Sequence, residues 1–361
     1  MSKINYIILL FLLFQVEVNA QIFTGTIYDR VTKVPIADAH IYLNGSSYFT
    51  ITSDSGTYHL EVREKLNTQM IISHLLYETF VIDQPFDKEK TKAIYLTEKE
   101  NMFDEVVIKP KFRFSRREMM NAFETQFLGN NREGKSCKIL NKDDIQLFYN
   151  DTVKTLYAKC NQPIIVENEF LGYQIQISLN SFYVRYKHHT LKERDIELLS
   201  LFRGNMFFVD MAPHNPVIKK RRDESYQSSS RYFFKSMANN VIKESNLIIF
   251  NSSLTKQIDY RSTIEPEHYF DIIDKGSDKL VRIKPNTNIN KNTGTVFNYP
   301  HPPFGVIAVS DHKGGLSEIV FLTDEFTVDK FGIVIDKSSY IYLSGQMYNL
   351  RVGNMVPMDY E

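Results

Sequence analysis

The chain has 361 residues, 43% of them hydrophobic and 13% aromatic, which is enough for substantial apolar cores and, by length, for two domains. Lys plus Arg and Asp plus Glu number 43 each, so the formal net charge is zero. No overall field therefore draws the chain to nucleic acid or to anionic lipid, and we exclude a nucleic-acid-binding protein.

The first 20 residues have the pattern of a secretory signal peptide. Lys3 precedes an apolar run, and Val18-Asn19-Ala20 places small residues at the expected cleavage site. That run is too short to cross roughly 30 Å of hydrocarbon, and no later run reaches the length of a transmembrane helix. We therefore expect an exported mature chain that begins near Gln21 and has no transmembrane helix. Its expected location is the periplasm, the periplasmic face of the outer membrane, or the medium.

Residues 21–108 predict an all-β domain. Short β-branched and aromatic segments recur between turn formers about every 8–12 residues, which is typical of a sandwich. Asn44-Gly45 predicts a tight hairpin turn, because both residues tolerate positive φ. The expected strands are 22–28, 39–43, 48–52, 57–62, 70–74, 79–82, 93–96 and 105–108.

The same region resembles the carboxypeptidase regulatory-like family, a transthyretin-like sandwich found on Bacteroidota outer-membrane proteins. The residues that carry the resemblance are Gly25, Ile27, Asp29, Thr32, Pro35, Ile36, Ala39, Ile41, Leu43, Asp54, Gly56, Tyr58, Leu60, Ile72, Ser73, Tyr77 and Asp104–Val107. The resemblance implies a seven- or eight-stranded β-sandwich in which these residues serve the fold and not chemistry. Leu76 departs from the glycine that the family usually carries before the aromatic residue, so the local turn is expected to differ.

Residues 109–128 predict a linker followed by a helix. Ser115 and Glu118 have the spacing of a capping box, and an apolar residue recurs every fourth position at Met119, Phe123 and Phe127. Gly129 supplies a C-terminal stop. We therefore expect a helix over 116–128 that packs its aromatic face on the second domain.

Residues 129–361 predict a larger β-rich domain, which gives a mainly β protein with about two helices. The second helix is expected over 229–241, with hairpins turned by Asn150-Asp151 and by Lys313-Gly314-Gly315, and a loop over 285–303. The expected strands are 145–149, 153–159, 164–167, 173–179, 182–186, 269–273, 280–283, 305–310, 316–322, 333–335 and 340–343.

Several phrases in this half resemble a Bacteroidota family in which a regulatory-like sandwich precedes a β-rich region of unknown function. They are Phe127-Leu128-Gly129, Cys137–Asn141, Glu167-Asn168, Leu171-Gly172-Tyr173 and Arg351-Val352-Gly353 through Pro357, Asp359 and Tyr360. The resemblance implies two domains, and it brings no activity with it.

The histidines do not form a metal-peptidase motif. No His is followed three positions later by Glu, and His188 and His189 are adjacent, so in a strand they point to opposite faces. The nearest approach is His268 with Asp271, expected in a strand where residues three apart face opposite sides. A nucleophile elbow and a phosphate-binding glycine loop are also missing from the sequence. We therefore expect no catalytic residue, no cofactor and no metal.

Four groups of residues leave alternatives open. Cys137 and Cys160 would form a disulfide in an oxidising compartment or remain two buried thiols. The basic run Lys219-Lys220-Arg221-Arg222 is expected to be a solvated loop, the alternative being a contact with lipopolysaccharide phosphates or an acidic partner. The aromatic cluster belongs mostly to a core, with the alternative of a groove for peptide or glycan lined by Phe202, Phe207, Phe208 and Tyr232. The carboxylates Asp143, Asp144, Glu265 and Glu267 leave a glycosidase pair open, since spatial separation cannot be read from sequence.

The favoured hypothesis is a non-catalytic binding or assembly module of the cell envelope with a protein partner there, a peptide or glycan ligand being the variant. One alternative is an uncharacterised hydrolase that uses carboxylates of the second domain. Another is an accessory protein related to TonB-dependent receptors. The receptor itself is disfavoured, because about 250 residues after residue 108 are too few for a barrel of about 22 strands.

Overall fold

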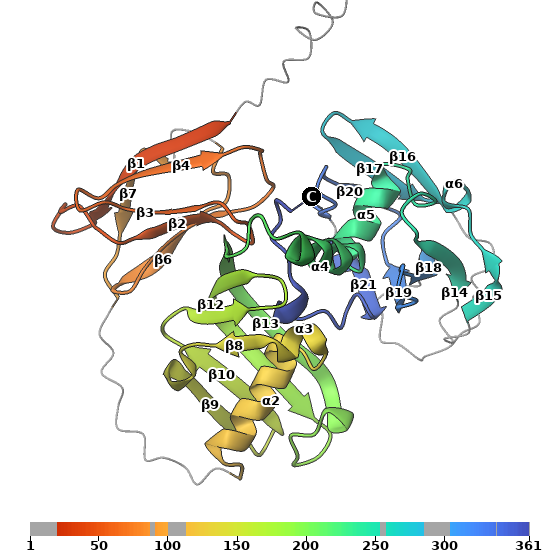
Figure 1. The fold of residues 1–361 in the computed structure, drawn as a ribbon, viewed down its shortest axis with the longest axis horizontal. Coiled ribbons are helices and arrows are strands. Elements are labelled where there is room, and N and C mark those ends of the chain that lie inside the picture. The colour runs from red at the N-terminus through yellow and green to blue at the C-terminus, as the bar shows by residue number, and fades with distance from the viewer. Residues whose placement is uncertain are drawn as a thin grey trace, which may run out of the picture. The chain divides into compact units, whose positions relative to one another are not determined.

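The computed structural model describes residues 20–86, 91–99, 113–252, 258–284, 304–336 and 338–360. The chain divides into two compact units, one formed by residues 1–44 and 48–101, the other by residues 45–47 and 102–361. Both units are mainly β, as expected (Figure 1). The signal peptide up to residue 19, the expected strand 105–108 and the expected loop 285–303 lie outside the described residues. In the part of the chain that is described, no helix has the length and apolarity that crossing a membrane requires.

The first unit is the predicted β-sandwich. Within its described residues one sheet has the order β4-β1-β7, with β7 parallel to β1, and the other has the order β3-β2-β5-β6. Alternate residues of each strand enter the core, as in β4, where Tyr58, Leu60 and Val62 are buried and their neighbours exposed. The strands are β1 (Gln21–Asp29), β2 (His40–Leu43), β3 (Phe49–Ile51), β4 (Thr57–Val62), β5 (Met70–His74), β6 (Tyr77–Ile82) and β7 (Ala93–Leu96).

Two glycines of the signature serve close backbone contacts. A Cβ on Gly25 would lie 2.3 Å from the carbonyl oxygen of Thr91, so only glycine lets β1 pass this segment. Gly56 adopts φ 70° in the turn that begins at Asp54, and a Cβ there would lie 2.7 Å from Pro35. These positions therefore fix backbone geometry.

The polar signature residues satisfy backbone groups. Oδ1 of Asp29 accepts hydrogen bonds from the amides of Val31 (2.8 Å) and Thr32 (2.6 Å), and its Oδ2 accepts one from the Tyr77 hydroxyl (3.0 Å). The hydroxyl of Tyr58 donates to the Thr91 carbonyl at 2.6 Å. Asp29 thus holds the turn after β1 and joins it to β6.

Two turns of the sandwich can be compared with the predictions made from the sequence. The hairpin between β2 and β3 has a five-residue loop, 44–48, in place of a tight turn at Asn44-Gly45, although Gly45 does have φ 76°. The departure at Leu76 falls in a two-residue turn, Leu75-Leu76, between β5 and β6. Both leucines are exposed, so this departure from the family pattern lies outside the core.

The second unit begins with a six-stranded sheet built around one long strand. β12 pairs with β13 along one edge, and its other edge is shared by β11 and β10, which follow one another in a single row. Two strands were expected where β12 is continuous, and β8 and β13 were missed. The strands are β8 (Cys137–Ile139), β9 (Ile145–Asn150), β10 (Thr155–Cys160), β11 (Ile164–Asn168), β12 (Tyr173–Tyr186) and β13 (Ile196–Asp210).

The helix α2 (Arg116–Leu128) covers one face of this sheet (Figure 1). Its capping box is formed by Ser115 and Glu118, as predicted. Phe123 stacks on Phe127 with ring centroids 4.9 Å apart and meets Phe182 of β12 edge-on at 4.7 Å. Burial of this aromatic face fixes the helix on the sheet.

The rest of the second unit holds two further sheets with the orders β15-β14-β18-β19-β21 and β16-β17-β20. The hairpin at Lys313-Gly314-Gly315 joins β18 to β19, as predicted, and Gly314 has φ 77°. The expected strand 333–335 is not formed. The strands are β14 (Ile248–Ser252), β15 (Ile258–Thr263), β16 (Phe270–Lys275), β17 (Asp278–Ile283), β18 (Gly305–Ser310), β19 (Leu316–Phe321), β20 (Glu325–Val328) and β21 (Ile341–Gly345).

The helices of this region differ from the single expected helix over 229–241. That helix is α5 (Ser230–Ala238), and it packs on β17 and β20. A second helix, α4 (Pro216–Gln227), stands where a loop was expected, with Asn215 as its N-cap. One-turn helices α3 (Arg132–Lys135) and α6 (Pro266–Tyr269) complete the described set.

The C-terminal segment ties these elements together. Nδ2 of Asn168 donates to the Gly353 carbonyl at 3.0 Å, and Oγ of Ser225 on α4 donates to the Asn354 carbonyl at 2.7 Å. Arg231 on α5 donates to the Pro357 carbonyl at 2.8 Å. The last described residues therefore link the turn after β11 to both helices.

Candidate functional site

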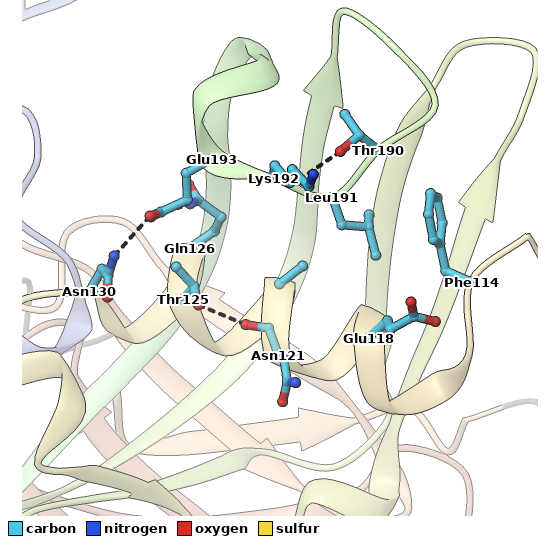
Figure 2. A pocket seen from close by; sticks show the side chains of 11 residues that line it. Phe114, Glu118, Asn121, Thr125, Gln126, Asn130, Thr190, Leu191, Lys192 and Glu193 are labelled. Atoms are coloured by element: carbon cyan, nitrogen blue, oxygen red, sulfur yellow. Dashed lines mark hydrogen bonds between the residues drawn. The ribbon is translucent and has the colours of Figure 1, made fainter.

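A cavity of about 390 Å³ lies between α2 and the loop that joins β12 to β13. Figure 2 shows Phe114 and Leu191 toward one end, and Glu193 with Gln126 and Asn130 toward the other. This volume falls in the range of small-molecule sites, roughly 300–1,000 Å³. We therefore treat this groove, called the α2 groove below, as the candidate site.

The carboxylate of Glu193 is held in place by two amides. Nδ2 of Asn130 donates to it at 2.8 Å, and Nε2 of Gln126 donates at 3.2 Å. Gln126 is only 6% exposed, so its position is set by packing. A carboxylate offers about four lone-pair positions, which leaves acceptor capacity beyond these two bonds.

The carboxylate of Glu118 is held at the other end of the groove. It accepts hydrogen bonds from the Ser115 hydroxyl (2.7 Å) and amide (2.8 Å), and these bonds, the hydroxyl's first, lower its pKa. Phe114 beside it is braced edge-on against Tyr149 at 4.9 Å. The groove therefore combines fixed acceptors with an apolar end.

The pKa of Glu118 does not suit a general acid of glycoside hydrolysis. A glycosidase needs one carboxyl group with a raised pKa as its general acid. The pKa of Glu118 is shifted in the opposite direction, because its hydrogen bonds favour the charged form. Glu118 is thus an acceptor and not a proton donor at neutral pH.

The four carboxylates that the sequence left open lie in two different places. Asp143 and Asp144 are exposed in a 3-10 turn. Glu265 and Glu267 both pair with one lysine, Lys243, at 2.5 and 3.2 Å, and the pKa of Glu267 is lowered. A backbone hydrogen bond at Glu267 first, and then the bond to Lys243, lower the pKa of Glu267, which is the opposite of the shift that a general acid needs.

The histidines that the sequence singled out lie apart from their candidate partners. His268 lies in α6 and not in a strand, whereas Asp271 lies in β16 and pairs with Lys284 at 3.0 Å. His188 and His189 are exposed. Across the described ranges, no group of three or more His, Cys, Asp or Glu residues is placed to hold a metal ion.

The four aromatic residues proposed for a groove do not line one. Phe207 and Phe208 are each 2% exposed, and Phe202 packs edge-on against Phe127 at 5.2 Å. Tyr232 belongs to a different core, where it meets Tyr226 at 5.3 Å. These residues are therefore packed in cores, as the sequence favoured for most of the aromatic cluster, and they do not form the groove that was left as the alternative.

The two cysteines are free, so of the two alternatives that the sequence left open the structure has two thiols and no disulfide. Cys137 of β8 lies opposite Asn168, the last residue of β11, whereas Cys160 is the last residue of β10. β10 and β11 follow one another along the same edge of β12, so Asn168 lies eight residues beyond Cys160. At a rise of about 3.3 Å per residue, the Cα atoms of Cys137 and Cys160 are much farther apart than the roughly 7 Å limit of a disulfide. Burial raises the pKa of both thiols, that of Cys137 to about 12.

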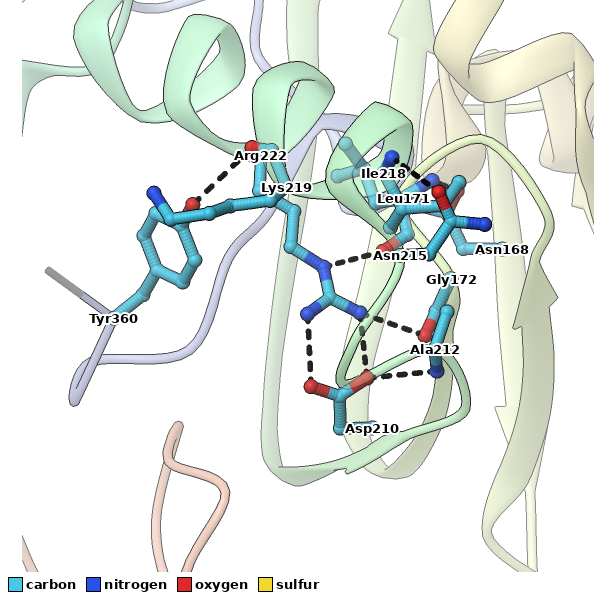
Figure 3. Close-up of polar contacts among 10 residues, drawn as sticks. All are labelled: Asn168, Leu171, Gly172, Asp210, Ala212, Asn215, Ile218, Lys219, Arg222 and Tyr360. Carbon is cyan, nitrogen blue, oxygen red and sulfur yellow. Dashed lines mark hydrogen bonds and ion pairs between the residues drawn. The ribbon is translucent and has the colours of Figure 1, made fainter.

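The basic run belongs to α4 and is not a solvated loop. Arg222 is 5% exposed, and its guanidinium forms two bonds to the Asp210 carboxylate, at 2.6 and 2.8 Å (Figure 3). It also donates to the carbonyls of Leu171 (2.7 Å) and Gly172 (3.0 Å) and lies 3.9 Å from the Tyr173 ring centroid. With four hydrogen bonds formed, Arg222 holds the turn after β11 and is not available to a ligand.

The comparisons with known proteins concern the sandwich alone. Residues 23–108 match the family model of the CarboxypepD_reg-like domain. This match confirms the resemblance of the sandwich to the carboxypeptidase regulatory-like family and identifies residues 23–108 as such a domain, which is a non-catalytic class. No curated protein and no solved structure matches the chain.

Proposed function

We propose that this protein is a non-catalytic binding or assembly module of the cell envelope, exported by its first 20 residues. The regulatory-like domain supports this proposal, because that domain class is non-catalytic. The partner is an envelope protein, and the ligand that reaches the α2 groove is a peptide or glycan segment.

The observation that carries the proposal is the construction of the α2 groove. Glu193 is held by Asn130 and Gln126, and Glu118 by Ser115, so both carboxylates are positioned before any ligand arrives. Fixed acceptors reduce the ordering entropy lost on binding. Neighbouring amide and hydroxyl groups suit a ligand rich in hydrogen-bond donors.

The test is a binding and cleavage screen with the mature chain, from residue 21 onward, against peptide and glycan panels. Glu193→Gln keeps the shape of the side chain and removes its charge, while Glu197→Gln removes an exposed charge on β13 as the control. We expect one ligand class to bind uncleaved, with affinity lowered about tenfold or more in Glu193→Gln and unchanged in the control. Turnover of any panel member by pure wild-type protein would instead establish the hydrolase alternative.

A further inference from the structure

The basic run on α4 contains one arginine that the fold does not neutralise. Lys219 pairs with Asp223 at 3.0 Å, and Arg222 pairs with Asp210. Arg221 lies between them and is half-buried, and its guanidinium donates a long bond of 3.4 Å to the Phe170 carbonyl. Successive side chains of a helix point about 100° apart, so these neighbouring residues of α4 contact different partners.

A second arginine lies against the same aromatic ring. Cζ of Arg221 is 4.7 Å from the Phe170 ring centroid, and Cζ of Arg132 on α3 is 5.0 Å from it. The two guanidinium carbons are therefore at most about 10 Å apart. Phe170 is itself held, because its ring packs partly buried against the core beneath α2. Stacking on this ring orders both guanidiniums.

Neither arginine has an acidic partner within the described residues. Glu133 and Glu169, the acidic neighbours in sequence, form no ion pair with Arg132 or Arg221 in that part of the chain. Two like charges thus lie within about 10 Å of each other with no ion pair among the described residues, while each keeps planar donors for a ligand. Ordered guanidiniums with spare donors are the groups that proteins use to bind oxyanions.

We propose that Arg132 and Arg221, ordered by Phe170, form a binding site for a phosphate group, free or esterified. A phosphate monoester carries a charge of about −1.5 to −2 at pH 7, which matches two guanidiniums, whereas one carboxylate would leave half of the charge unbalanced. The site shares no residue with the lining of the α2 groove and does not rest on the function proposed for it.

The first arm of the test measures inorganic phosphate binding to the mature chain by titration calorimetry at low ionic strength, with acetate as the carboxylate comparison. The second arm measures co-sedimentation with phosphatidylcholine vesicles, with and without phosphatidic acid. The variants are the double variant Arg132→Gln/Arg221→Gln and the control Lys220→Gln, which removes an exposed cation from the same helix.

We expect wild-type protein to bind phosphate more tightly than acetate, and the double variant to bind it at least about tenfold more weakly. Lys220→Gln should stay within about twofold of wild type. Binding to inorganic phosphate alone would identify a soluble ligand, and additional binding to phosphatidic acid vesicles a lipid headgroup. If the double variant does not fold, the single variant Arg132→Gln, which changes an exposed residue, should also bind phosphate at least about tenfold more weakly than wild type.

Three results would overturn the proposal. The first is no binding of wild-type protein to phosphate in either arm. The second is equal affinity for phosphate and acetate. The third is an equal loss in Lys220→Gln and in the arginine variants, which would reveal a diffuse charge effect and not a site formed by Arg132 and Arg221.

Discussion

Replacing Arg222 by alanine should destabilise the second unit strongly. The change removes four hydrogen bonds, leaves the Asp210 carboxylate without its cation, and leaves the Leu171 and Gly172 carbonyls without this donor. Removal of one partner from a buried ion pair typically costs about 3–5 kcal/mol. Because the Asp210 side chain is 34% exposed, water recovers part of this loss, and we expect about 3 kcal/mol.

The assay is urea unfolding followed by far-UV circular dichroism, since the chain contains no tryptophan. A loss of this size should also lower the melting temperature by roughly 6–12 °C. Lys219→Ala breaks an exposed pair on the same helix and should cost less than about 0.5 kcal/mol. A loss below about 1 kcal/mol in Arg222→Ala, or an equal loss in Lys219→Ala, would refute the structural role assigned to Arg222.

Three further predictions concern stability and the thiols. Burial acts to raise the pKa of Asp210, but its bonds to Arg222 lower this pKa overall. The stability that Asp210 contributes is therefore present above about pH 3.8 and is lost as pH falls through the lower folded-state pKa. Urea midpoints at pH 7, 4 and 3 should fall further in wild type than in Asp210→Asn, and an equal fall in both would contradict this role of Asp210. Gly25→Ala should cost about 2 kcal/mol in thermal unfolding, since a Cβ would meet the Thr91 carbonyl, and unchanged stability would refute that contact. Because burial raises their pKa values, Cys137 and Cys160 should react slowly with iodoacetamide at pH 8 in the native chain. In urea both should be alkylated fully without reductant, as read by mass spectrometry. Alkylation that requires a reductant would instead reveal a disulfide.

The sequence was most informative where periodicity and turn chemistry agree. The sandwich strands alternate in polarity between turn formers, and α2 carries both a capping box and an apolar residue at every fourth position. Such local signals need no knowledge of distant contacts. They therefore predicted the described strands of the first unit and α2 nearly to their observed bounds.

The sequence was least informative where tertiary contacts override the pattern. On α4 the buried positions include Ile218, Arg222 and Tyr226, and an arginine at a core position hides the apolar stripe. On β13 the pattern is interrupted at Gly204, where a Cβ would lie 2.6 Å from the Ser178 carbonyl. In both cases the deciding partner is remote in the sequence.

The candidate sites could not be read from the sequence for the same reason. The α2 groove joins α2 to Glu193, more than sixty residues later, through Asn130 and Gln126. The phosphate site joins Arg132 to Arg221 over Phe170. The basic run did indicate unusual charge at Arg221, but only the fold separates this residue from the structural Arg222.

The most direct test of the envelope-module account is site-specific photo-crosslinking in the native cell, followed by fractionation. A photoreactive residue replaces Lys192, exposed at the α2 groove, and in a control strain replaces Lys275, exposed on β16. The account predicts a mature chain in the envelope fraction and a defined adduct from position 192 that weakens with Glu193→Gln. A chain that remains in the cytosol with its first 20 residues uncleaved, or that gives equal adducts from both positions, would contradict it.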